Sequence, residues 1–163
     1  MLVVFGASGD LTSRKLMPAI ERLGLRRLLP GGFSVVGVGR TPMTDDDFLA
    51  RMRALVAEGG GGGDETDHVW DAFGGGGFRY VAGDYGDRET YAQLRQLFAE
   101  LDRDRGASGN RLYYLATPPA TFPIIAAALG ESGLSRPEHA DAFVRIVIEK
   151  PYGHDEASGA ALD

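Results

Sequence analysis

A glycine-rich turn at residues 6–11 has the composition of an anion-binding loop. It reads Gly6-Ala7-Ser8-Gly9-Asp10-Leu11, directly after an apolar run and directly before a segment of helical period. Glycine lets the backbone approach a pyrophosphate closely, and the N-terminus of the following helix offers N–H donors and a positive dipole. The spacing is neither the full G-x-G-x-x-G pattern nor a P-loop. We predict that this turn binds the pyrophosphate of a dinucleotide; a plain connection between a strand and a helix is the alternative.

Arg40 and Thr41 follow a second apolar run, which ends in Gly37-Val38-Gly39. A site for NAD usually carries an acidic residue at this point, which accepts hydrogen bonds from the ribose hydroxyls. An arginine can instead pair with a 2′-phosphate through its planar guanidinium. We therefore predict that Arg40, with Thr41 beside it, binds the 2′-phosphate of NADP. A solvated arginine at a strand end is the alternative, and one arginine does not exclude the use of NAD as well.

An aspartate and two tyrosines near later apolar runs are further candidates. Asp84 and Tyr85 follow the third run, where the adenine or a ribose could lie, and an ordinary loop with a helix N-cap is the equal alternative. Tyr114 lies in the fourth run, which Thr117-Pro118-Pro119 must end because proline donates no hydrogen bond to a sheet. We expect Tyr114 either to contact the cofactor or to pack as a core or stacking aromatic residue.

Lys150 stands at the end of the last apolar run, in the segment Glu149-Lys150-Pro151-Tyr152-Gly153. A lysine at this place could bind an anionic substrate or hydrogen-bond a sugar hydroxyl. His154 follows in a polar turn, and we expect it to be solvated rather than to act as a general base. No metal site is predicted, because the acidic and histidine residues of 64–71 are expected to belong to a flexible loop.

The apolar runs predict β-strands at 2–5, 34–38, 78–82, 111–116 and 144–149. The first, second and last runs are almost continuously apolar, which suits strands buried on both faces. Segments of helical period alternate with them, at 11–29, from 45 onward, at 87–104, at 119–132 and from about 155. We therefore predict an α/β fold, a Rossmann-like doubly wound parallel sheet with helices on both faces. Such sheets bind ligands at the carboxyl ends of their strands.

Residues 59–77 interrupt this alternation with glycine runs at 59–63 and 74–77. Glycine loses the most backbone entropy when it is ordered, and a loop of this length is unusual in a compact domain. We expect a flexible, glycine-rich excursion between the second helix and the third strand.

The composition is that of one globular domain covering residues 1–163, with 44% hydrophobic residues. Its 17 Lys+Arg and 23 Asp+Glu give a net charge of −6, which does not favour nucleic acid as a partner. The chain has no cysteine, so disulfides, cysteine-bound zinc and a thiol nucleophile are excluded. No apolar stretch reaches the roughly 20 residues that cross a bilayer, and the N-terminus does not have the pattern of a secretory signal. We expect a cytoplasmic protein without a membrane partner.

These motifs together resemble the N-terminal coenzyme domain of the glucose-6-phosphate dehydrogenase family. The resemblance rests on residues 3–11 with 14–16, on 36–40, on 110–119 and on 148–153, and it covers nearly the whole chain. It implies that NADP is bound by the turn at 6–11, with Arg40 on the 2′-phosphate. It also places Tyr114 and Lys150 near the nicotinamide, with Lys150 reaching the sugar phosphate and Pro151 coupling the two sites. In the family, the segment that matches 59–77 is largely helical.

The resemblance implies the oxidation of glucose 6-phosphate at C1 to a lactone, with hydride transfer to NADP. In the family a histidine supported by an aspartate removes the hydroxyl proton, within an R-I-D-H-Y-L-G-K-E motif that this sequence does not contain. We therefore expect no catalytic residue in this chain, which would be a truncated enzyme that binds coenzyme without turning over substrate. The full-length protein is expected to be a homo-oligomer. The alternatives are a free-standing NADP-binding module without dehydrogenase activity and a remnant that binds nothing.

Overall fold

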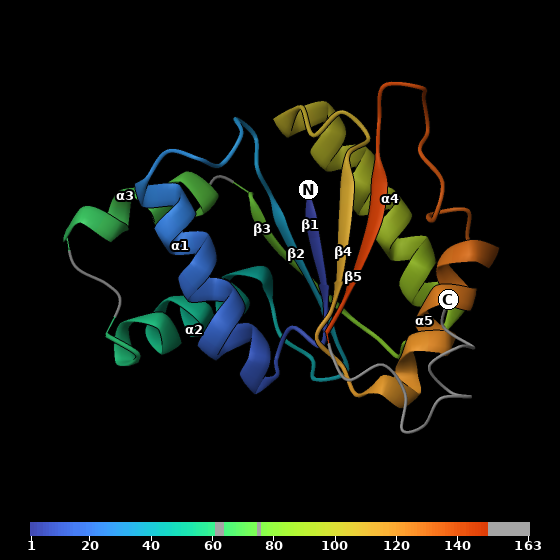
Figure 1. Ribbon diagram of the computed structural model, residues 1–163, viewed down its shortest axis with the longest axis horizontal. Helices are drawn as coiled ribbons and strands as arrows, with labels where there is room; N and C mark the ends of the chain where they lie inside the picture. The colour runs from blue at the N-terminus through green and yellow to red at the C-terminus, as the bar shows by residue number, and fades with distance from the viewer. Residues whose placement is uncertain (61–63, 75, 150–163) are drawn as a thin grey trace.

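The computed structural model describes residues 1–60, 64–74 and 76–149, which fold around a parallel sheet (Figure 1). The strands are β1 (Leu2–Phe5), β2 (Val35–Gly39), β3 (Phe78–Ala82), β4 (Arg111–Leu115) and β5 (Val144–Ile148). They form one five-stranded sheet in the order β3-β2-β1-β4-β5, and every pairing is parallel. Leu2 of the central β1 pairs with Val35 on one side and with Leu112 on the other. The predicted parallel sheet is confirmed.

Helices cover both faces of the sheet. A right-handed crossover places its helix on one face when the chain moves from β1 toward β3, and on the opposite face when the chain moves from β1 toward β5. One face carries η1 (Thr12–Leu16), α1 (Met17–Leu25), α2 (Asp45–Glu58) and α3 (Asp64–Gly74). The other face carries α4 (Arg88–Arg105), η2 (Pro119–Thr121) and α5 (Phe122–Glu131). In Figure 1 these groups lie to the left and right of the sheet. The predicted doubly wound α/β fold is confirmed.

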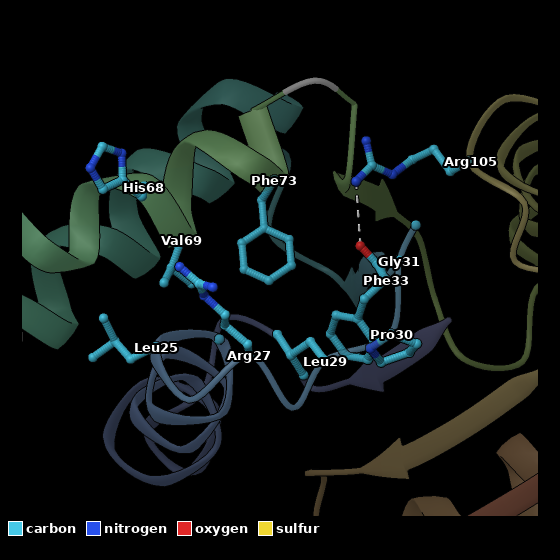
Figure 2. A pocket seen from close by; sticks show the side chains of 12 residues that line it. Leu25, Arg27, Leu29, Pro30, Gly31, Phe33, His68, Val69, Phe73 and Arg105 are labelled. Carbon is cyan, nitrogen blue, oxygen red and sulfur yellow. Dashed lines mark hydrogen bonds between the residues drawn. The ribbon is translucent and has the colours of Figure 1, made fainter.

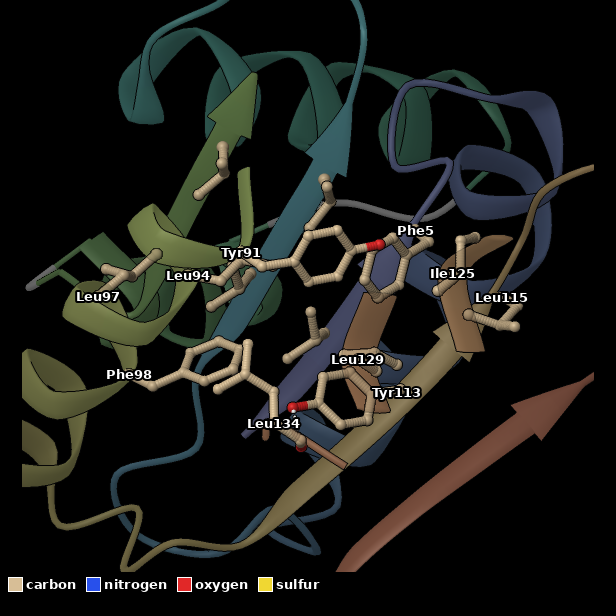
Figure 3. Close-up of a cluster of buried hydrophobic side chains, with 14 of the residues drawn as sticks. Phe5, Tyr91, Leu94, Leu97, Phe98, Tyr113, Leu115, Ile125, Leu129 and Leu134 are labelled. Atoms are coloured by element: carbon tan, nitrogen blue, oxygen red, sulfur yellow. Dashed lines mark hydrogen bonds between the residues drawn. The ribbon is translucent and has the colours of Figure 1, made fainter. Parts of the chain in front are cut away.

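Two hydrophobic cores separate the helices from the sheet, since successive side chains of a strand point to opposite faces. Val3 and Phe5 enter the core beneath α4 and α5, which Figure 3 shows, whereas Leu2 and Val4 enter the core beneath α1, α2 and α3. The first core also contains Tyr91, Leu94, Phe98, Tyr113, Ile125 and Leu129, and the second contains Met17, Ile20, Phe48, Met52, Trp70 and Phe78. β1 and β2 are therefore buried on both faces, as predicted.

The helical segment after the glycine turn is irregular before Pro18. η1 is π-helical, and the Met17 N–H donates to the carbonyl of Thr12, five residues back. Proline lacks the N–H that would continue a regular helix, and a widened turn before it accommodates this loss. The segment predicted to be helical over 11–29 thus begins with one π-helical stretch before the regular helix α1.

The expectation that the last strand is buried on both faces is wrong. β5 lies at an edge of the sheet, and Ile146 and Val147 are 41% and 36% exposed. Its almost continuous apolar run is typical of a central strand, but sequence periodicity does not indicate which strands lie at the edge of a sheet. Among the described residues, no helix covers the outer part of β5 on the α1 face.

The loop predicted over 59–77 is wrong for residues 64–74, which form α3. Trp70 and Phe73, three residues apart, are 2% and 4% exposed, and the Trp70 indole donates a hydrogen bond to the buried Glu21 carboxylate at 2.9 Å. This apolar stripe stabilises a helix against α1 even though glycine runs flank it. The mobility expected for this region stays a prediction.

Candidate functional site at the carboxyl edge of the sheet

Gly6 begins the turn after β1 in a conformation that favours glycine. Its φ is +82°, and its N–H donates to the carbonyl of Val38 at 2.9 Å. A Cβ at this position would lie 2.4 Å from the carbonyl oxygen of Ala116, so no side chain fits between β1 and the end of β4. The turn is therefore pressed against the sheet, as close approach of a ligand to the backbone requires.

The rest of the turn is supported by buried hydroxyl groups from the helix that follows. The Thr12 hydroxyl donates to the carbonyl of Gly6 at 3.1 Å, and the Ser13 hydroxyl donates to that of Gly9 at 3.3 Å. The N–H groups of Ser8 and Asp10 have no hydrogen-bond acceptor within the described residues. Asp10 and Leu11 are already helical. Open N–H donors at the start of a helix suit an anion.

Glycines at 37 and 39 make room between the turn and the segment that carries Arg40. A Cβ on Gly37 would lie 2.9 Å from the Ala7 Cβ, and one on Gly39 would lie 2.5 Å from the Tyr80 hydroxyl oxygen. The Tyr80 hydroxyl donates to the carbonyl of Thr41 at 2.9 Å and so fixes this backbone. Sequence analysis missed Tyr80, because only the pairing of β2 with β3 brings residues 41 and 80 together.

Arg40 and Thr41 are exposed at the end of β2. In the described part of the chain, the Arg40 guanidinium makes neither a hydrogen bond nor an ion pair. Burial raises the pKa of the Tyr85 phenol, and the positive charge of Arg40 opposes this rise, which places the two side chains near each other. The structure thus brings an unpaired guanidinium to the same edge as the glycine turn.

Asp84 and Tyr85 form the ordered connection between β3 and α4. The Asp84 carboxylate accepts a hydrogen bond from the Gly86 N–H at 3.0 Å, which is a turn-forming role, and the N-cap of α4 is Asp87. The Tyr85 ring packs edge-on against Phe5, with ring centroids 6.0 Å apart. Asp84 thus forms a turn in this loop and Tyr85 is half-buried, while a contact of either residue with the cofactor stays a prediction.

Arg51 is a second guanidinium at the glycine turn, and sequence analysis did not identify it. It lies on the exposed face of α2 and donates to the carbonyl of Ser8 at 3.3 Å. An exposed arginine in an amphipathic helix is common, so no local signal marks it. Its position follows only from the way α2 packs beside the turn.

Tyr114 lies on the α1 side of β4, where it pairs in register with Val4 of β1. Its ring lines an apolar cavity of about 600 Å³ together with Leu16 and Val147, and its hydroxyl donates to the Glu149 carboxylate. Burial, with Glu149 adding to it, raises the pKa of Tyr114 to about 12. The described structure thus shows Tyr114 as a partly buried packing residue, and a cofactor contact stays a prediction.

Lys150 lies outside the described residues, as do Pro151, Tyr152, Gly153 and His154, so their predicted roles stay predictions. Within residues 1–60, 64–74 and 76–149, no group of three or more His, Cys, Asp or Glu residues could hold a metal ion. In the same part of the chain, no helix is both long and apolar enough to span a bilayer.

The strand order defines the class of protein. The chain moves outward from β1 through β2 to β3, then returns to β4 on the other side, so the direction reverses between β1 and β4. In doubly wound sheets, this switch point is where ligands bind. The turn at 6–11 lies there, with Arg40 on the neighbouring strand end. The class is that of Rossmann-type dinucleotide-binding domains.

Comparison with known proteins identifies the family. Residues 3–163 match the family described as "Glucose-6-phosphate dehydrogenase, NAD binding domain", and the chain belongs to this family. This membership supports a nicotinamide dinucleotide as the cofactor.

Relatives and solved structures agree with this assignment. The chain is 41% identical over 162 residues to glucose-6-phosphate 1-dehydrogenase 2 of Mycobacterium tuberculosis, covering 99% of this chain and 31% of that protein. It is 34% identical over 165 residues to the Bacillus subtilis glucose-6-phosphate 1-dehydrogenase, covering 100% of this chain and 31% of the relative. The crystal structure of the Mycobacterium avium enzyme superposes with a TM-score of 0.78 at 32% identity, over 99% of this chain and 32% of that one. The chain thus spans about a third of the length of these relatives.

Proposed function

We propose that this chain is the NADP-binding part of a glucose-6-phosphate 1-dehydrogenase. The proposal is carried by one observation: a glycine turn after β1, with open Ser8 and Asp10 N–H groups, lies at the same edge as an arginine after β2 that is unpaired among the described residues. A Cβ on Gly6 would collide with the Ala116 carbonyl, so the turn keeps this backbone conformation only with glycine. A glycine at this place also lets the pyrophosphate of a dinucleotide approach the backbone closely. The family name alone covers both NAD and NADP, and Arg40 favours NADP.

Each part of the cofactor would be bound by a different element. The open N–H groups of Ser8 and Asp10 would donate to the pyrophosphate, within the turn of residues 6–11. Arg40 and Thr41 would bind the 2′-phosphate, with Arg51 adding positive charge at short range. Asp84 and Tyr85 would lie along the adenosine half. Tyr114 and Lys150 are proposed for the nicotinamide half, on the resemblance alone.

The substrate proposed for the complete enzyme is glucose 6-phosphate. A related glucose-6-phosphate dehydrogenase, solved in complex with its substrate glucose-6-phosphate, superposes with a TM-score of 0.79 at 26% identity, over 99% of this chain and 32% of that one. When bound, NADP would accept the hydride released from C1 of the sugar. The contribution of this chain would be to bind and orient the cofactor, and Lys150 would bind the substrate.

The described histidines do not lie where the reaction needs a base. His68 is on α3 in a cavity at the amino edge of the sheet, and His139 contacts Gly109, just before β4 begins. Both are therefore at the opposite edge from the glycine turn. This arrangement supports the proposal that the general base belongs to a segment of the enzyme beyond the described residues.

We further propose that the complete protein works in the cytoplasm as a homo-oligomer. No nucleic acid or membrane partner is proposed, since the net charge of −6 would repel phosphate backbones and anionic lipids alike. Size-exclusion chromatography of the full-length enzyme with light scattering would measure the oligomeric state.

The cofactor preference is tested by calorimetric titration of NADP and NAD into wild type and Arg40→Ala. Loss of a charge-assisted phosphate contact should weaken NADP binding about ten- to a hundredfold and leave NAD binding nearly unchanged. Arg103→Ala is the matched control, because Arg103 is exposed at the far end of α4 and pairs with Asp104. Equal loss of NADP affinity in both variants, or no loss in Arg40→Ala, would refute the role of Arg40.

A further inference from the structure

A second cavity lies at the amino edge of the sheet, opposite the glycine turn. Its volume is about 450 Å³, it is open to solvent on one side, and it is lined by the end of α1, the connection to β2, α3 and the end of α4 (Figure 2). Leu25, Leu29, Phe33, Val69 and Phe73 supply apolar walls. A cavity of this size, apolar with a few polar groups, is typical of a small-molecule site.

The polar side chains that line this cavity are two arginines and one histidine. Arg27, His68 and Arg105 line it, and none of the described lining residues is acidic, although the whole chain has a net charge of −6. The hydrogen bonds that position Arg105 include one from Nε to the Ser34 hydroxyl at 3.1 Å and one from a terminal nitrogen to the carbonyl of Phe33 at 3.5 Å. Figure 2 shows it across the cavity from Arg27. The charged side chains among the described lining residues are thus the two arginines.

Arg27 occupies a backbone position that normally favours glycine. Its φ is +54°, its N–H donates to the carbonyl of Gly24 at 2.9 Å, and the Leu28 N–H donates to that of Leu23 at 2.9 Å. These two bonds are the Schellman motif, in which a left-handed residue ends a helix, and glycine occupies that place without steric strain. An arginine at a strained position suggests that its side chain is needed there.

The Arg27 guanidinium is also unpaired in the described structure. It makes no hydrogen bond and no ion pair with the described residues, and in Figure 2 it lies near Val69 and Phe73. We propose that this cavity is a binding site for a small organic anion, a phosphate or carboxylate attached to an apolar or aromatic group. The anionic group would pair with Arg27, and the apolar group would pack on Phe73 and Leu29.

The site can be tested with phenyl phosphate and benzoate as probes, added to the 163-residue protein. Trp70 is the sole tryptophan of the chain, and its ring lies 6.2 Å from that of Phe73, so its emission reports on the cavity wall. Both anions should give saturable changes in this emission and in the amide resonances of residues 24–33 and 66–73. Phenol keeps the ring without the charge, and should give no saturable change.

Arg27→Gly is the decisive variant, because glycine keeps the left-handed backbone while the guanidinium is removed. It should weaken phenyl phosphate binding about tenfold or more, with the thermal midpoint unchanged or raised. Arg26→Ala, one residue away and not in the cavity lining, is the control of equal charge and should bind as wild type does.

Three results would overturn the proposal: no saturable change with either anion, equal affinities in wild type and Arg27→Gly, or equal binding of phenol. A competing site at the glycine turn is distinguished by repeating the titration with Arg40→Ala. The amino-edge resonances should respond as in wild type, and a response confined to residues 6–11 would contradict the assignment. None of these outcomes depends on whether the turn binds NADP.

Discussion

At the scale of single residues, Gly6 carries the strictest geometric requirement of the turn. Gly6→Ala would place a Cβ 2.4 Å from the Ala116 carbonyl and force alanine into a left-handed φ of +82°. We expect the free energy of unfolding to fall by about 2–4 kcal/mol, measured by urea denaturation. Affinity for NADP should fall with it, because the turn must move away from β4.

Gly31→Ala is the matched control, since a Cβ there would meet no atom within 4 Å and Gly31 has no positive φ. Its free energy of unfolding should change by less than about 0.5 kcal/mol. Equal effects of the two substitutions would show that the Ala116 contact does not restrict the turn.

The site residues that could be predicted from sequence are those whose signal is local. The glycines of the turn and Arg40 follow directly on apolar runs, so their place at strand ends can be read from the chain. Tyr80 and Arg51 could not be found in this way, because each reaches the site only through tertiary packing. Tyr114 shows a related limit: the sequence locates it in β4, but not which neighbours it contacts.

At the scale of elements, α3 depends on its contact with α1. Trp70→Ala removes a buried indole. It should lower the free energy of unfolding by about 3–5 kcal/mol, or release α3 from its contact with α1. Amide hydrogen exchange would show this as loss of protection across residues 66–73. Asp71→Ala, on the exposed side of the same helix, should leave exchange unchanged. Rapid exchange of these amides in the wild type would restore the original loop prediction.

The α3 region shows why an element can be missed. The flanking glycines have low helix propensity and so argue against a helix. The helix is stabilised instead by the burial of Trp70 and Phe73. The reverse case is β5, whose apolar run correctly predicts a strand but not its exposed edge position. The other strands agree with prediction to within a residue, because short, mainly apolar runs between helical segments are a strong local signal.

A partly buried ion pair joins the end of α4 to the start of β4. Asp102 accepts hydrogen bonds from Arg111 at 3.0 Å and from the Gly109 N–H at 3.1 Å, and the Arg111 guanidinium lies 4.9 Å from the centre of the Phe98 ring. Burial alone would raise the pKa of Asp102, but these donors and the charge of Arg111 outweigh it and hold the pKa below its usual value.

This pair should make stability depend on pH. Because the pKa is lower in the folded protein, the stabilisation is fully present above the ordinary value of about 3.9 and is lost as pH falls through the folded value. At pH 7, Asp102→Asn should lower the free energy of unfolding by about 1–3 kcal/mol. The difference from wild type should shrink below about pH 4. Asp104→Asn, at an exposed pair, is the control, and a pH-independent difference for Asp102→Asn would exclude the ionic contribution.

At the scale of the whole molecule, binding and catalysis are expected to be separable. The carboxyl edge holds the proposed cofactor site, while His68 and His139 lie at the amino edge. We predict that the 163-residue chain, mixed with glucose 6-phosphate and NADP, forms no NADPH above background. Sustained NADPH formation would show that a general base lies within this chain after all.

The measurement that tests the proposed cofactor site most directly is an NMR titration of the 163-residue protein with NADP. We predict saturable shifts of the amides of Gly6, Ser8, Asp10 and Arg40, weaker with NAD, while the amides around the amino-edge cavity stay unchanged. An absence of saturable shifts in a folded protein, or shifts confined to the amino edge, would contradict the assignment of the carboxyl edge as an NADP site.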